Sequence, residues 1–182
     1  MSWIIYCYLA ILLLLCLYLV IVILRILPLI IYVHQPLPFV PIPNQAAKEL
    51  AQLPQLQSAS TIVDLGCGTG TLLSALHRYH PTAQLTGVEY KASLLRWAKW
   101  RVIFWKKQPT LICGDMFKYD LSQVDAVVGF WIPRLTQQLV DKFVAEAKPG
   151  CVMISYLFPL PNHPQLQTIH QGERKIFLYQ KT

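Results

Sequence analysis

Charged side chains are scarce in this sequence, and its first 24 residues have none. Lysine, arginine, aspartate and glutamate make up 14% of the chain, against roughly a quarter in an average soluble domain. The 16 basic and nine acidic residues all lie at Arg25 or later, which concentrates the apolar excess at the N-terminus. This distribution excludes an ordinary soluble protein, a disordered chain and a polytopic transporter. It predicts one membrane segment joined to one modest globular domain.

Paired cysteine motifs are absent as well. The five cysteines are scattered and include no C-x-x-C pair, so the sequence predicts neither a disulfide framework nor a zinc site. His77 and His80 are three residues apart on an expected helix, which is a possible metal spacing, but no third ligand lies near them. We therefore expect no metal in this protein.

The uncharged segment from Trp3 to Leu24 has the length of a membrane-spanning helix. Its 22 residues rise 1.5 Å each and would cross a hydrocarbon core of ~30 Å. No basic stretch precedes it and no A-x-A site follows, so we predict an uncleaved anchor rather than a signal peptide. Arg25 and Lys48 lie on its C-terminal side, which predicts an outside N-terminus and a cytoplasmic domain, at the inner or plasma membrane in a bacterium. Residues 26–33 contain Pro28 and either extend the anchor or lie along the membrane interface.

The rest of the chain predicts an α/β domain. We assign residues 1–33 to the transmembrane anchor, 34–43 to a proline-rich junction and 44–182 to the globular domain. Alternating strands and helices in that domain predict a mostly parallel, Rossmann-like sheet, and the tail predicts a C-terminal antiparallel hairpin. The expected strands are residues 61–65, 84–88, 110–113, 124–130, 151–157, 167–170 and 174–180, and the expected helices are 44–53, 71–80, 92–106 and 135–147.

A glycine-rich loop follows the first expected strand. The segment Asp64-Leu65-Gly66-Cys67-Gly68-Thr69-Gly70 lacks the G-x-G-x-x-G spacing of dinucleotide-binding proteins and the Gly-Lys-Ser/Thr of a P-loop. Acidic residues follow the next two strands, with Glu89 nineteen residues after Gly70 and Asp115 in Gly114-Asp115-Met116. Because ligands of open α/β sheets bind where the strands end, these residues predict one shared site.

This arrangement resembles the class I S-adenosylmethionine-dependent methyltransferases, whose first motif is D-x-G-x-G-x-G. The resemblance implies that S-adenosyl-L-methionine is the cofactor, that Asp64 orients its amino group and that Glu89 accepts both ribose hydroxyls. The implied cofactor-binding residues are Asp64, Gly66, Cys67, Gly68, Gly70, Glu89, Tyr90, Asp115 and Met116. On its own, Asp115 could equally cap a turn.

A narrower resemblance extends over nearly the whole chain. The segments Phe39–Pro43, Gly114–Lys118, Phe158–Pro161 and Lys175–Tyr179 occur in the order seen in the small membrane-anchored protein-lysine methyltransferases of ATP synthase and of the adenine nucleotide translocase. In the first of these groups the methylated chain is the one that forms the c-ring. The resemblance implies a lysine of a membrane protein as the substrate. Lys91-Ala92-Ser93 replaces the Asn-Pro that relatives carry after the strand-two acid, which bears on substrate choice.

The methyl-acceptor side of the site is less defined by sequence. The fourth strand runs into Phe130 and Trp131 and lacks Asn/Asp-Pro-Pro-Tyr, which argues against methylation of nucleobases or glutamine amides. The two aromatic rings either exclude water and steady an ammonium group or belong to the core. No catalytic base is apparent, and the candidates for the substrate pocket are Phe130, Trp131, Pro133, Pro159 and Pro41.

A basic, aromatic stretch runs from Lys91 to Lys107 without an acidic residue. It carries six basic residues between which Trp97, Trp100, Phe104 and Trp105 are interleaved. This pattern fits binding to nucleic acid, contact with an anionic membrane surface, or a solvated helix whose tryptophans pack on the sheet. A membrane anchor in the same chain favours lipid over nucleic acid.

The sequence therefore predicts a membrane-anchored methyltransferase that modifies lysine on a membrane protein. Two alternatives remain at this point. One is a methyltransferase of a small lipophilic acceptor such as a quinone or lipid, and the other is a non-catalytic, membrane-tethered binding module. The three intact motifs argue against the last.

Overall fold

The computed structural model describes residues 2–33, 39–171 and 175–182, which form two separate compact units divided after Val40. The first unit contains helix α1 (Ser2–Val33). The helix continues through Pro28 to Val33, so the segment after Arg25 extends the helix instead of leaving it. The stretch Trp3–Leu27 is long and apolar enough to cross a membrane, and none of it is buried within the structure.

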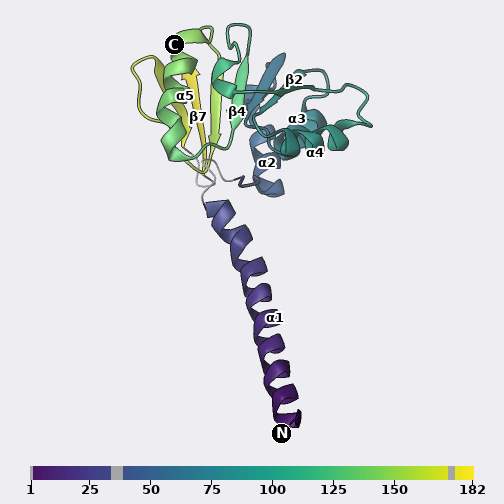
Figure 1. The fold of residues 1–182 in the computed structure, drawn as a ribbon. Helices are drawn as coiled ribbons and strands as arrows, with labels where there is room; N and C mark the ends of the chain where they lie inside the picture. The colour runs from purple at the N-terminus through teal and green to yellow at the C-terminus, as the bar shows by residue number, and fades with distance from the viewer. Residues whose placement is uncertain (1, 34–38, 172–174) are drawn as a thin grey trace. The chain divides into compact units, whose positions relative to one another are not determined.

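The second unit is an α/β domain built on one sheet of seven strands (Figure 1). The strands are β1 (Thr61–Leu65), β2 (Gln84–Glu89), β3 (Thr110–Cys113), β4 (Ala126–Gly129), β5 (Val152–Tyr156), β6 (Leu166–Gln171) and β7 (Ile176–Lys181). Their order is β3-β2-β1-β4-β5-β7-β6, with β7 antiparallel to both of its neighbours and the first five parallel. The predicted parallel sheet and C-terminal antiparallel hairpin are therefore confirmed, although residues 172–174 between β6 and β7 lie outside the described residues.

Helices cover both faces of this sheet because each crossover between parallel strands must return over one face. Helices α2 (Asn44–Ala51), α3 (Thr71–Tyr79) and α4 (Ala92–Val102) pack on one face, and α5 (Pro133–Glu146) packs on the other (Figure 1). Two short 3-10 turns, Pro54–Leu56 and Met116–Lys118, complete the domain. Two apolar cores result, one under α2, α3 and α4 and one under α5.

Two helix boundaries differ from the prediction. The helix expected over 92–106 ends at Val102, after which Trp105 turns inward and stacks on His77 with ring centroids 4.2 Å apart. The helix expected from Leu135 begins two residues earlier at Pro133, because proline's fixed φ and missing N–H suit the first helical turn. Neither change moves a predicted site residue off the carboxyl ends of the strands.

Candidate active site

The glycine loop turns sharply between the end of β1 and the start of α3. Gly66, Gly68 and Gly70 have φ values of +83°, +55° and +77°, in the left-handed region where a side chain would be strained. The N–H groups of Gly66 and Cys67 both donate to the Val88 carbonyl oxygen, at 2.8 and 3.0 Å. The loop is thereby tied to the end of β2, where Glu89 lies.

Glu89 holds the middle of this loop from a buried position. Its Oε2 accepts a hydrogen bond from the Gly68 N–H at 2.9 Å, and its Oε1 accepts one from the Lys91 N–H at 2.8 Å. The side chain is 8% exposed. An ionised carboxylate offers about four acceptor positions, so each Glu89 oxygen keeps one for a further donor. The geometry therefore leaves room for two hydroxyl donors on this one residue.

Asp64 is the most unusual residue of the site. It is 2% exposed, and its Oδ2 is buried without a hydrogen-bond partner among the residues that the structure describes. Burial, and then the negative charge of Glu89, raise the pKa of Asp64 to about 8. A buried carboxylate without a partner destabilises the ligand-free fold unless it is protonated or meets a cation. Asp64 is thus suited to receive a positively charged donor group.

Cys67 packs inside the domain, behind the loop. It is 6% exposed, and a Cβ placed at Gly87 on β2 would come within 2.8 Å of its sulfur. Gly87 and Cys67 therefore fit one another across the start of the loop. Cys67 contributes its backbone N–H to the loop and its side chain to the core.

The segment after β3 is joined to the same strand end. The Gly114 N–H donates to the Glu89 carbonyl oxygen at 3.0 Å. Asp115 Oδ1 accepts from the Phe117 N–H at 2.9 Å and so caps the 3-10 turn Met116–Lys118. Asp115 and Met116 are both half-buried, whereas Tyr90 is 74% exposed beside the end of β2. The carboxyl ends of β1, β2 and β3 thus bring together the residues that sequence motifs had singled out.

The two aromatic residues after β4 have different surroundings. Trp131 is 2% exposed, and its Nε1–H donates to the Leu65 carbonyl oxygen at 2.7 Å. This bond ties the end of β4 to the end of β1, so Trp131 belongs to the core beneath the site. Phe130 is half-buried, with its ring edge-on to Tyr156 at 5.4 Å and stacked on Phe158 at 6.2 Å.

Phe130, Tyr156 and Phe158 form an aromatic cluster at the ends of β4 and β5. Sequence reasoning did not assign a site role to Tyr156 or Phe158, although Phe158 lies in a segment quoted for the family resemblance. Leu157 between them has a φ of +74°, a conformation rare for residues with a side chain. The Ser155 hydroxyl donates to the Phe158 carbonyl oxygen at 2.7 Å and holds this turn.

The candidate prolines lie at the surface. Pro133 is the first residue of α5 and Pro159 follows the aromatic cluster, and both are exposed. Pro41, also exposed, precedes α2, and in the described part of the chain no hydrogen bond or ring contact joins it to the glycine loop. The structure thus brings Pro133 and Pro159 toward the strand ends by their sequence positions, but it does not link Pro41 to them.

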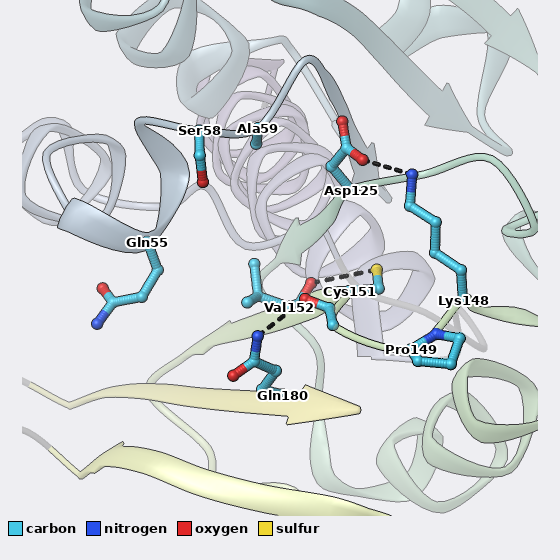
Figure 2. Close-up of a pocket in the computed structure, with 10 residues that line it drawn as sticks. Gln55, Ser58, Ala59, Asp125, Lys148, Pro149, Cys151, Val152 and Gln180 are labelled. Carbon is cyan, nitrogen blue, oxygen red and sulfur yellow. Dashed lines mark hydrogen bonds and ion pairs between the residues drawn. The ribbon is translucent and has the colours of Figure 1, made fainter. Parts of the chain in front are cut away.

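A cavity of about 350 Å³ lies at the amino ends of β1, β4 and β5, away from this site (Figure 2). The carboxylate of Asp125 pairs there with Lys148 and accepts from the Thr61 N–H, and Gln180 Nε2 donates to the Gly150 carbonyl oxygen. These interactions hold the strand ends to one another. None of the predicted site residues lines this cavity.

The predicted histidine pair has structural contacts instead of a metal. His77 stacks on Trp105, and His80 Nε2 lies 2.7 Å from the Ala51 carbonyl oxygen. Within residues 2–33, 39–171 and 175–182, no group of three or more histidine, cysteine or acidic residues is placed to hold a metal ion.

Comparison with known proteins identifies the family. Residues 64–167, more than half of the chain, match the model of the ANTKMT methyltransferase domain. A protein-lysine N-methyltransferase of Saccharolobus islandicus is 23% identical over 129 residues, covering 68% of this chain and 78% of that protein. A human lysine N-methyltransferase named for the C-type chain of ATP synthase is 25% identical over 147 residues, covering 79% of this chain and 61% of its own length.

The fold is similar to that of solved methyltransferases. An RNA methyltransferase of Salinibacter ruber, in complex with S-adenosyl-L-homocysteine, superposes with a TM-score of 0.61 at 23% identity. The superposition covers 77% of this chain and 91% of that one. The cofactor predicted from the glycine loop is therefore supported by family and fold together, and the chain belongs to the ANTKMT methyltransferase family as a class I S-adenosylmethionine-dependent methyltransferase.

Proposed function

We propose that this methyltransferase modifies a lysine side chain of a membrane protein while α1 anchors it in the bilayer. The observation that carries the cofactor site is the buried, unpartnered Oδ2 of Asp64 beside the glycine loop. The lysine specificity is supported by the two relatives whose names state that activity. The membrane location is supported by the apolar length of Trp3–Leu27 and by Arg25 on its C-terminal side, which favours a cytoplasmic domain.

The loop residues divide the cofactor between them by charge. Asp64 accepts from the positively charged amino group, which satisfies its free oxygen and stabilises its ionised form. Glu89 uses its two remaining acceptor positions for the ribose hydroxyls. Gly66, Gly68 and Gly70 let the backbone approach the ligand closely, with Cys67 completing the loop.

The segments beyond the loop serve the adenine side in this proposal. Asp115 and Met116, half-buried after β3, line that side together with Tyr90. Asp115 already accepts from the Phe117 N–H through Oδ1, which leaves Oδ2 for an amino donor. Capping the turn and contacting the ligand are therefore compatible roles for one carboxylate.

The aromatic cluster receives the methyl acceptor. S-adenosylmethionine supplies an electrophilic methyl group on a sulfonium, and the attack needs a neutral amine in line with the breaking bond. Phe130, Tyr156 and Phe158 present ring faces that favour a methylated ammonium and keep water away from it. Positioning of this kind is the main contribution a protein makes to such a displacement.

The amine loses its proton without a side-chain base in the adjoining segments. Residues 130–135 and 157–162 contain no acidic residue and no histidine. Desolvation by the aromatic rings lowers the pKa of an incoming lysine and favours its neutral form. Its proton passes to water before the amine lone pair attacks.

Labelling of membranes tests the substrate class. Membranes containing the full-length chain are incubated with S-adenosylmethionine carrying a radioactive methyl group, and protein and lipid are then separated. We expect label in protein, with mass spectrometry locating it on lysine. Label confined to the lipid fraction would contradict the lysine proposal and support a lipophilic acceptor.

A pair of acidic variants tests the cofactor site in the same membranes. Asp64→Asn should abolish labelling, because its amide cannot replace a buried negative charge. Asp141→Asn, which changes an exposed acid on α5, is the matched control and should label normally. Equal labelling by both variants would refute the role of Asp64.

A further inference from the structure

The outer surface of α4 carries large apolar side chains in full contact with solvent. Trp97 and Trp100 are 68% and 73% exposed, and Ile103 and Phe104, just after the helix, are 49% and 93% exposed. Residues 97, 100 and 104 are spaced by three and four, which places them along one side. We call Trp97, Trp100, Ile103 and Phe104 the α4 aromatic face.

This exposure is not caused by a helix lacking a core face. Leu95, Ala98 and Val102 of the same helix are at most 4% exposed. Trp105, close by in sequence, turns inward onto His77 and packs against the core. The interpretation in which the tryptophans pack on the sheet thus holds for Trp105 and is wrong for Trp97 and Trp100.

Positive charge surrounds the α4 aromatic face. No acidic residue occurs between Lys91 and Lys107. Arg96, Lys99 and Lys106 are exposed and take part in no ion pair or side-chain hydrogen bond within the described residues. These three cations are therefore available to a negatively charged surface.

We propose that the α4 aromatic face enters the headgroup region of an anionic phospholipid bilayer. Tryptophan prefers the interface between lipid and water, and basic side chains next to it attract anionic headgroups. A nucleic acid would pair with the cations and could stack on the rings, but it offers no apolar medium for Ile103 and Phe104. A bilayer satisfies all of these groups together.

The same helix is also joined to the cofactor loop. The Arg101 Nε–H donates to the Thr69 carbonyl oxygen at 2.9 Å, and a Cβ at Gly70 would lie 3.4 Å from the Cβ of Ala98. A bilayer that binds the outer side of α4 thus fixes the cofactor loop close to the headgroups. This goes beyond anchoring by α1, because it orients the domain as well as tethering it.

Tryptophan fluorescence of the full-length chain tests this proposal. Trp3→Phe removes the signal of α1 and leaves Trp97, Trp100, Trp105 and Trp131, of which Trp131 is buried. The protein is reconstituted in vesicles of phosphatidylcholine with or without phosphatidylglycerol, using lipids brominated in the acyl chains. We expect quenching and a blue shift in the anionic vesicles, and loss of most of the quenching without phosphatidylglycerol.

Variants in the Trp3→Phe background assign the signal. Replacing Trp97 and Trp100 with leucine should leave an emission that brominated lipid does not quench. Arg96→Gln combined with Lys99→Gln should lose most of the quenching. Arg78→Gln combined with Arg134→Gln removes two exposed arginines from α3 and α5 and should keep it.

Flotation of the vesicles separates this inference from the proposed anchor. A chain that fails to float with vesicles after a carbonate wash refutes membrane anchoring by α1. A chain that floats but shows no quenching in anionic vesicles refutes docking through α4. Binding of a mixed RNA in detergent, lost on changing Arg96 and Lys99, would also overturn the lipid proposal.

Discussion

Asp64 couples proton binding to cofactor binding. Its pKa of about 8 means that the ligand-free protein carries a protonated Asp64 at neutral pH, whereas an ammonium ligand requires the ionised form. Below pH 8, therefore, affinity for S-adenosylmethionine should rise about tenfold per pH unit. Titration calorimetry in buffers of different ionisation enthalpy should detect proton release near pH 7. Asp64→Asn should abolish it, whereas a release that persists in this variant would assign the proton to another group.

The same shift predicts how stability depends on pH. A carboxyl whose pKa is raised by folding stabilises the fold at low pH, and this contribution is lost as pH rises from its unfolded value near ~4 through about 8. The ligand-free chain should therefore unfold at progressively lower temperature over that range. Asp64→Asn should flatten the dependence and Asp141→Asn should not. A parallel fall in the Asp64→Asn variant would mean that other groups cause it.

Glu89 links the glycine loop to the end of β2. Glu89→Ala removes the acceptor of the Gly68 and Lys91 N–H groups and the two positions proposed for the ribose. Hydrogen bonds to charged groups contribute ~1.5–3 kcal/mol each, so cofactor affinity should fall by a factor of about 100. Glu146→Ala, on α5, is the control. Unchanged cofactor affinity in Glu89→Ala would refute the assignment.

Gly129 shows how closely the site is packed onto the core. A Cβ there would lie 2.5 Å from the ring of Trp131, whose Nε1–H is bonded to Leu65. Gly129→Ala should thus lower the free energy of unfolding by ~1–3 kcal/mol in urea titrations. Gly114→Ala, whose Cβ would meet nothing nearer than 3.8 Å, should change it by under ~0.5 kcal/mol. Equal effects would contradict the packing argument.

At the scale of elements, the ends of β4 and β5 decide the environment of the methyl acceptor. Phe158→Leu keeps an apolar side chain but removes the ring that stacks on Phe130. Loss of a desolvated cation–π contact costs ~1–2 kcal/mol, so kcat/KM for methyl transfer should fall about tenfold. Cofactor affinity should be unchanged, as measured by calorimetry. A loss of cofactor affinity instead would place Phe158 in the cofactor site.

Element boundaries followed sequence patterns only as far as local signals reach. The strands were predicted to within about two residues, because short apolar runs bounded by turn residues are local features. The C-terminal end of α4 was not, since Trp105 leaves the helix to meet His77, which lies on α3. Such a contact between residues far apart in sequence has no signal in either segment alone.

At the scale of the whole molecule, the two units have separate tasks. The first places an apolar helix where the second contributes catalysis, and no side chain of Trp3–Leu27 needs a partner in the domain. Leu14→Arg combined with Leu15→Arg adds two charges at mid-span, at ~2.5–3.5 kcal/mol each. We expect loss of carbonate-resistant membrane association with normal cofactor affinity.

Alanine at the same two positions is the matched control and should preserve membrane association. Retention of the double-arginine variant in washed membranes would show that α1 is not the anchor. Loss of cofactor affinity in that variant would show that the two units depend on each other.

The sequence by itself determined the apolar helix, the strand and helix order, and the positions of the glycines and acids that end the strands. These features are local, because spacing and composition act within a few residues. Only the tertiary structure decided which polar and aromatic groups are buried. Asp64 lacks a partner, Trp131 enters the core and Trp97 faces solvent because burial depends on which distant segments pack around a residue. That packing made one chemical type serve as a ligand site, a core residue or a surface.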